Sequence, residues 1–249
     1  MQKGFRNEID FVISLNNKKY GDLSIEFKSL LSKLFKNLNT DTNIICWQSK
    51  YSEKADIKIK INNEIKGVSI KCGANCSFHQ ESVQKFSNYL IKIGVENNII
   101  KNFNDFIKGY VKGNKVDAKT YINNNKEEIA EIIDSFNKLY VKINLILRFI
   151  FQGTELQKYD CDAIIYGTPS KFLWATKNEV IEYLVNYDTI SIYQIGLSAL
   201  SIKCYDRNLK NNQSRINCTE DIQVKWYTFK KDLLYLTKIR EAKSIQLYN

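Results

Sequence analysis

The segment from Asp56 to Glu81 constrains the fold more than any other part of this chain. Apolar residues stand at every second position in two short runs, which are Ile57, Ile59 and Ile61 in the first and Val68, Ile70 and Cys72 in the second. Because side chains alternate between the two faces of a strand, each run is typical of a β-strand with one apolar face. The short polar stretch between them predicts a β-hairpin.

The apolar pattern also limits the register of this hairpin. A reversal at Asn63-Glu64 would set Asp56 opposite Lys71, and a reversal one step earlier, at Asn62-Asn63, would set Asp56 opposite Ser69. A slip of a single residue would mix the apolar and polar faces, so we do not expect it. Both remaining registers place Asp56 and Lys71 on the same face, at the open end of the hairpin.

A helix is predicted directly after the hairpin. Ser77 and Gln80 have the spacing of a capping box, which favours a helix start at Ser77. The helix would run to about residue 93, with Phe86, Leu90 and Ile93 on its buried face. Glu81 would then lie in its first turn, close to where Lys71 leaves the sheet.

Asp56, Lys71 and Glu81 together suit one kind of chemistry. Hydrolysis of a phosphodiester needs a metal ion to neutralise developing charge and to orient water. Mg²⁺ prefers hard oxygen ligands such as two carboxylates, and a lysine can offset charge or position the attacking water. The plainer alternative is an exposed cross-strand ion pair beside an ordinary helix-start glutamate, with Ser69 a surface hydroxyl.

Composition agrees with a folded, basic protein. The chain has 249 residues, 44% hydrophobic and 12% aromatic, which excludes a mainly disordered chain. The formal net charge is +10, from 37 Lys and Arg against 27 Asp and Glu. Such a surface favours nucleic acid or an anionic membrane as a partner, although an A/T-rich genome would also enrich lysine. Charge alone does not separate DNA from RNA.

The sequence predicts a cytoplasmic protein. The amino terminus has no apolar core of signal-peptide length, and the most apolar run, residues 143–151, is too short to span a bilayer. Six scattered cysteines are then expected to be reduced thiols. Cys72, Cys76 and His79 could begin a zinc site, but no fourth ligand is evident.

The rest of the chain predicts an α/β fold in which helices flank a mixed sheet. Helical patterns cover residues 5–35 and 97–151, and residues 178–185 form a further helix. Strands are expected at 44–47, 163–166, 172–175, 198–204 and 222–229. We interpret residues 1–249 as a single domain, with core elements in 1–95, a helical insertion in 96–152 and a strand-rich part in 153–249.

In its pattern of Asp56, Ser69, Lys71 and Glu81, the chain resembles the PD-(D/E)xK nuclease superfamily, which has the restriction-endonuclease-like fold. Most members start one strand with an aspartate and carry an acid-x-lysine triplet on the next. Here Asp56 matches the aspartate and Ser69-Ile70-Lys71 the triplet, with serine in place of the acid. Some type II restriction enzymes share this serine and take the second carboxylate from the following helix, where Glu81 stands. The proline of the motif is also absent, because Ala55 precedes Asp56.

The resemblance implies a set of site residues. Asp56, Glu81 and Glu8 would bind Mg²⁺, with Asp10 as the alternative to Glu8 on the amino-terminal helix. Lys71 would serve the attacking water and Ser69 would support the site. A rival acid and lysine set, formed by Asp160, Asp162 and Lys177, lacks a comparable helix glutamate and has no acid or serine two residues before its lysine.

The implied activity is Mg²⁺-dependent hydrolysis of double-stranded DNA, as in a type II site-specific restriction endonuclease, and a symmetric site would imply a homodimer. A repair or defence nuclease of the same fold and a non-catalytic nucleic-acid-binding protein are the alternatives. Candidate DNA contacts combine basic and amide side chains that can reach phosphates or base edges: His79, Arg207, Asn208, Lys210, Arg215 and Lys225.

Overall fold

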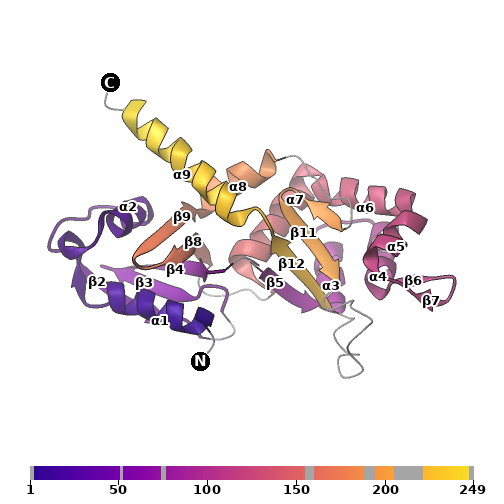
Figure 1. Cartoon of the computed structure of the whole chain (residues 1–249), viewed down its shortest axis with the longest axis horizontal. Coiled ribbons are helices and arrows are strands. Elements are labelled where there is room, and N and C mark those ends of the chain that lie inside the picture. Colours follow the sequence, from indigo (N-terminus) through magenta and orange to yellow (C-terminus); the bar gives the residue numbers. More distant parts are fainter. Residues whose placement is uncertain are drawn as a thin grey trace. The chain divides into compact units, whose positions relative to one another are not determined.

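The computed structural model describes residues 3–50, 53–73, 77–154, 160–187, 194–204 and 221–246. It is a mixed α/β fold in which helices flank a curled mixed sheet (Figure 1). The chain divides by its internal contacts into two compact units. Unit 1 contains residues 1–76, 150–183 and 228–249, and unit 2 contains residues 77–149 and 184–227.

Unit 1 is built on a six-stranded sheet with the order β1-β2-β3-β4-β8-β9. All neighbours are antiparallel except β4 and β8, which are parallel. Its strands are β1 (Lys18–Lys19), β2 (Asn43–Gln48), β3 (Ile57–Ile61), β4 (Glu64–Lys71), β8 (Cys161–Thr168) and β9 (Lys171–Thr176). Its helices are α1 (Lys3–Leu15), the short η1 (Tyr20–Asp22), α2 (Ile25–Leu34), most of α8 (Lys177–Val185) and α9 (Phe229–Gln246).

One face of this sheet forms the core of unit 1 with α1 and α2. The helices contribute large apolar side chains, such as Phe11 and Leu30, and the sheet contributes Ile57, Val68 and Ile165. Each of these five residues is fully buried. The alternating isoleucines of the sequence therefore face a helical layer, as expected for one covered face of a sheet.

The hairpin has the second of the two predicted registers. Ile57 pairs with Val68 and Ile61 with Glu64, so the turn is Asn62-Asn63. The register that reversed at Asn63-Glu64 is wrong. Asn62 has φ of 53°, and asparagine tolerates this left-handed conformation better than most residues, which favours the two-residue turn at this point.

Unit 2 combines a four-stranded antiparallel sheet, in the order β10-β11-β12-β5, with a group of helices. Its strands are β5 (Ser77–Ser82), the small pair β6 (Tyr110–Val111) and β7 (Asn114–Lys115), β10 (Ile195–Leu197), β11 (Leu200–Cys204) and β12 (Asp221–Trp226). Its helices are α3 (Val83–Lys92), α4 (Asn97–Lys108), α5 (Ala118–Asn124), α6 (Lys126–Asn137), α7 (Leu139–Ile146) and the start of a π-helical segment, η2 (Leu147–Gln152). Phenylalanines from α3, α4 and α6 meet in its core.

The predicted helix start at Ser77 is wrong. Residues Ser77–Ser82 form β5, which pairs with β12, and α3 begins only at Val83. Ser82 is the cap, since its hydroxyl accepts a hydrogen bond from the Lys85 N–H at 3.3 Å. The expected buried face is present, with Phe86, Leu90 and Ile93 all buried. The pairing partner β12 lies far away in sequence, so local capping signals could not reveal the strand.

Other expectations concern the whole chain. Within the described residues, no helix is long and apolar enough to cross a membrane. The assignment of residues 1–249 to one nuclease domain stays a prediction. The carboxy-terminal strands divide between the two sheets, because β8 and β9 complete the sheet of unit 1 while β10, β11 and β12 join β5.

The cysteines of the described part of the chain are free thiols. Cys46, Cys72, Cys161 and Cys204 form no disulfide there. Burial raises the pKa of both Cys46 and Cys161 to about 12, so these two thiols stay protonated at neutral pH. Cys76, one of the candidate zinc ligands, lies outside the described residues.

Candidate active site

Asp56 is the centre of a small polar cluster in unit 1. One carboxylate oxygen, Oδ2, accepts hydrogen bonds from the Ser69 hydroxyl at 2.9 Å, the Ile70 N–H at 2.5 Å and the Lys71 ammonium at 3.4 Å. The described residues donate no hydrogen bond to the other oxygen, Oδ1. The Asp56 side chain is 22% exposed and that of Lys71 is 21% exposed, so solvent reaches both.

The hairpin creates this cluster. Asp56 stands immediately before β3, and its backbone N–H donates to the Val68 carbonyl at 2.9 Å, which extends the pairing of β3 and β4. Ser69 and Lys71 are two residues apart on β4 and therefore project from the same face. The expectation that Asp56 and Lys71 meet at the open end of the hairpin is thus met in the structure.

Lys71 carries a firmly held positive charge. Burial by itself would lower the pKa of Lys71, but the charge of Asp56, the neighbouring Cys161, the hydrogen bond to Asp56 and the charge of Glu8 together raise it above its ordinary value. As it stands, Lys71 is a cation rather than a proton acceptor. It can offset the charge of a phosphate and hold a water by hydrogen bonding.

Glu8 reaches the same cluster from α1. Burial raises the pKa of Glu8 and the charge of Asp56 adds to this, while a hydrogen bond from Gln48 and the charge of Lys71 oppose the rise. The Gln48 amide donates to Glu8 Oε2 at 2.8 Å. Asn7 fixes this part of α1, because its amide donates to the Gly167 carbonyl of β8 at 2.9 Å. Asp10, the alternative acid, is exposed.

The residue that the sequence did not reveal here is Gln48. It ends β2, opposite Ile57 in the sheet, and so lies beside the start of β3 where Asp56 stands. The sequence does show a polar residue, Gln48, directly after the strand predicted at 44–47. Its place beside Asp56 follows only from the pairing of β2 with β3, which local sequence does not give.

Glu81 occupies a different environment from the predicted one. It lies on β5 in unit 2, and its side chain is fully buried. Arg148 Nε donates to Oε1 at 2.8 Å and Arg148 Nη2 to Oε2 at 2.5 Å, while His79 Nε2 lies 2.7 Å from Oε1. Burial would raise the pKa of Glu81, but these partners outweigh it and lower the pKa. Metal binding by Glu81 stays a prediction, and it would compete with both partners.

The partners of Glu81 also bear on the predicted role of His79. His79 is 7% exposed, and its ring centre lies 5.2 Å from that of Phe149, with the two ring planes tilted at 42°. Arg148 lies with its guanidinium 4.1 Å above the ring of Tyr89. His79 is therefore part of a buried polar group in unit 2, and its contact with DNA stays a prediction.

The rival acid and lysine set, Asp160, Asp162 and Lys177, comes together only in part. Asp162 accepts hydrogen bonds from the Gly67 N–H at 2.9 Å and from the Lys66 ammonium at 3.4 Å. Lys177 instead pairs with Asp160 at 3.0 Å. Asp160 and Lys177 therefore meet, whereas Asp162 has other partners, so the described residues assemble the rival set incompletely.

The metal-binding capacity of the cluster follows from its donors. Asp56 and Glu8 supply two carboxylates that interact electrostatically, and each has one oxygen without a hydrogen bond from the described residues. Such hard oxygen donors, completed by water, suit Mg²⁺. Nowhere in the described part of the chain do three or more His, Cys, Asp or Glu side chains gather as a ready-made metal site.

Of the six candidate DNA contacts, His79 and Lys225 lie within the described residues. Arg207, Asn208, Lys210 and Arg215 lie outside the described residues. Lys225 lies on β12, half-buried, with its ammonium 6.0 Å from the ring of Tyr227. Its role in DNA binding stays a prediction.

Comparison with known proteins supports the fold. No protein-family model matches the sequence. Curated proteins give no match either. Among solved structures, the chain matches the fold of a restriction endonuclease. The matched protein is the restriction endonuclease MspI in complex with its cognate DNA, with a TM-score of 0.53, 13% sequence identity and coverage of 87% of each chain. At this identity the likeness shows the fold, and the predicted restriction-endonuclease-like architecture is confirmed.

Proposed function

We propose that this protein is a Mg²⁺-dependent endonuclease that hydrolyses phosphodiester bonds of double-stranded DNA at specific sites, as a type II restriction endonuclease does. The observation that carries the proposal is the cluster at the open end of the hairpin, where Asp56 is hydrogen-bonded to Ser69 and Lys71, and Glu8 is near enough to interact electrostatically with Asp56 and Lys71. The similarity to a restriction endonuclease that was solved with DNA supports it, as does the net charge of +10.

Each residue has a distinct role in this proposal. Asp56 and Glu8 would hold the metal through their oxygens that lack hydrogen bonds, and a bound Mg²⁺ would neutralise charge on the phosphate and orient water. Ser69 and the Ile70 N–H fix the orientation of Asp56 by binding its other oxygen. Lys71 places a cation beside the scissile phosphate and stabilises the charge that develops during displacement.

Glu81 is not needed for these steps. Its two oxygens are bound to Arg148 and His79, so we assign it a structural role in unit 2. A palindromic target would require two cluster copies, one for each strand, which is the reason to expect a homodimer.

Incubation with plasmid DNA and Mg²⁺ tests the activity. We expect discrete fragments, and chelation of the metal with EDTA should stop cleavage. A smear would instead indicate a nuclease without strict site specificity, as in repair or defence. A mobility shift without cleavage under any divalent metal would contradict the proposal and indicate a non-catalytic DNA-binding protein.

The variants Lys71→Ala and Lys177→Ala test the location of the site. Lys71→Ala should lower the cleavage rate by at least about 10²-fold, because a charge-stabilising donor is lost, while DNA binding remains. Lys177→Ala is the matched control, since it removes the lysine of the rival set, and it should cleave normally. The reverse result would move the active site to Asp162 and Lys177.

A further inference from the structure

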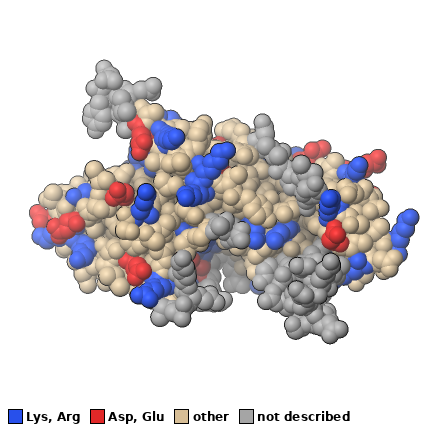
Figure 2. All heavy atoms as spheres, viewed as in Figure 1, with Lys and Arg blue, Asp and Glu red and all other residues tan. Residues whose placement is uncertain are grey.

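A second cation lies next to the cluster of unit 1. Lys230 is the second residue of α9, is exposed to solvent, and has its ammonium 6.0 Å from the centre of the Tyr166 ring. No carboxylate among the described residues pairs with it. Figure 2, drawn in the view of Figure 1, shows basic side chains over the part of the surface that α9 forms.

Tyr166 connects this cation to the proposed active site. It is the neighbour of Lys71 in the parallel pairing of β4 with β8, and such neighbours lie about 4.8 Å apart and project from the same face. The Tyr166 hydroxyl donates to the Gly73 carbonyl at 3.2 Å, and its ring meets Phe229 edge-on at 5.8 Å. The ring is therefore held between the end of β4 and the first residue of α9.

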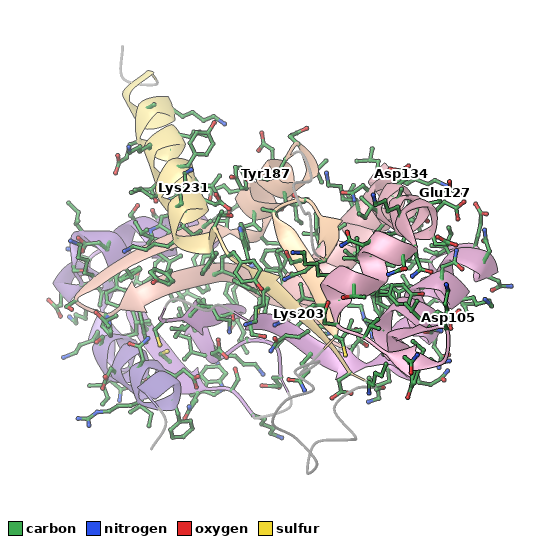
Figure 3. All side chains as sticks on the ribbon, turned by 45° about the vertical axis from the view of Figure 1, so that its right-hand side comes forward. Asp105, Glu127, Asp134, Tyr187, Lys203 and Lys231 are labelled. Atoms are coloured by element: carbon green, nitrogen blue, oxygen red, sulfur yellow. The ribbon has the colours of Figure 1, made fainter. Side chains whose placement is uncertain are left out.

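The start of α9 favours an anion. Its first turn contains Lys230 and Lys231, where the positive end of the helix dipole disfavours cations. The acid of this turn, Asp232, is 4% exposed and bonded to the Thr228 hydroxyl at 2.6 Å, so it lies beneath the surface. A phosphate outside the helix would offset both lysines and the dipole. Figure 3 labels Lys231 on this first part of α9.

We propose that Lys230, supported by the ring of Tyr166, binds a DNA phosphate that neighbours the one cleaved at Asp56 and Lys71. This inference rests on the proposed nuclease function and extends it by naming a substrate contact. Lys71 is the strand neighbour of Tyr166 and Lys230 lies over the Tyr166 ring, so the two cations are close enough for one strand of DNA to contact both. Lys230 acts in binding and leaves the chemical step unchanged.

Replacement of this charge gives a quantitative test. For Lys230→Gln, the slope of log K against log salt for a short duplex, measured by fluorescence anisotropy without Mg²⁺, should decrease in magnitude by about 0.9, the loss of one phosphate contact. Affinity at low salt should fall roughly threefold to tenfold, the KM for cleavage should rise by a similar factor, and kcat should stay within about twofold. Lys230→Arg keeps the charge and should restore the slope.

Lys238→Gln is the matched control, because Lys238 is exposed on the same helix two turns further on. It should leave the slope unchanged. An unchanged slope and KM in Lys230→Gln, or an equal effect of Lys238→Gln, would overturn the inference while DNA cleavage by the wild type still supports the proposed function. A wild-type protein that binds no duplex DNA would overturn both the phosphate contact of Lys230 and the proposed nuclease function.

Discussion

Two clusters in which an acid meets a basic side chain, one in each unit, differ in how far they are shielded from water. In unit 1, Asp56 and Lys71 have side chains that are 22% and 21% exposed. In unit 2, Glu81, Arg148 and His79 have side chains that are 0%, 8% and 5% exposed. Asp56 binds its partners through one oxygen, whereas Glu81 uses both.

The contrast teaches that an acid beside a cation is not by itself a reactive site. A buried carboxylate with both oxygens bonded holds its own elements together, and metal could reach it only if those bonds broke. A partly exposed carboxylate with a free oxygen can take a ligand at little cost. Exposure and unused bonding capacity therefore separate the candidate catalytic acid from the structural one.

Removal of the cation in each cluster should give the largest difference in the free energy of unfolding between the two clusters. Arg148→Met leaves the buried Glu81 carboxylate with His79 as its ion-pair partner and removes the stacking on Tyr89, so we expect a loss of about 3–5 kcal/mol in the free energy of unfolding. Lys71→Met, the matched change in the exposed cluster, should cost no more than about 1 kcal/mol. Urea denaturation measures both.

A double variant checks the cause of that loss. Glu81→Gln combined with Arg148→Met removes the buried charge together with its partner, and most of the stability should return. Equal losses in Arg148→Met and Lys71→Met would contradict the division into a structural and a catalytic cluster.

Loss of a single hydroxyl should have a smaller effect, confined to cleavage. Ser69→Ala removes one of the donors that orient Asp56, and we expect a roughly tenfold lower single-turnover rate, which corresponds to about 1.4 kcal/mol. Ser87→Ala is a matched control, because the Ser87 hydroxyl is also buried and bonded, at 2.9 Å to Asn104 in unit 2. Its cleavage rate should equal that of the wild type.

The smallest effect concerns pH, where the two glutamates should behave oppositely. Because the pKa of Glu8 is raised in the folded protein, ionisation of Glu8 lowers the free energy of unfolding above that pKa. This loss disappears as the pH falls toward 4.5. The lowered pKa of Glu81 means that its stabilisation is complete above 4.5 and is lost as the pH falls through the folded value.

Urea midpoints between pH 7 and pH 3 measure this difference. Glu8→Gln should be slightly more stable than the wild type at pH 7 and should cleave DNA poorly. Glu81→Gln should be less stable at pH 7 and should lose less stability below pH 4.5. The same sign for both variants at pH 7 would contradict the comparison.

Local patterns of the sequence were sufficient for the hairpin cluster. Alternation of isoleucines limited the register to two choices, and both brought Asp56 and Lys71 to one face. The remaining choice depended on turn chemistry at Asn62, which the alternation does not encode. The short range of these interactions explains why the cluster could be predicted.

Long-range pairing explains what could not be predicted. β5 contains the buried polar residues His79 and Glu81, so it lacks apolar alternation, and its partner β12 lies at the other end of the chain. Its first residues also fit a helix cap, so the sequence predicts a helix where the structure has a strand. α9 was not foreseen at all, because apolar residues occur around its whole circumference, from the buried Phe229 to the exposed Tyr235.

The parallel pairing of β4 with β8 has a consequence for synthesis of the protein. Val68 pairs with Ala163, so β4 remains an open edge until about 100 further residues have left the ribosome. At usual translation speeds this takes roughly 5–20 s, during which the edge is exposed to other chains. α9, with Lys230, follows β8 in the chain and is made later still. A growing chain therefore has the hairpin of Asp56 and Lys71 well before it can complete the surface proposed to hold DNA.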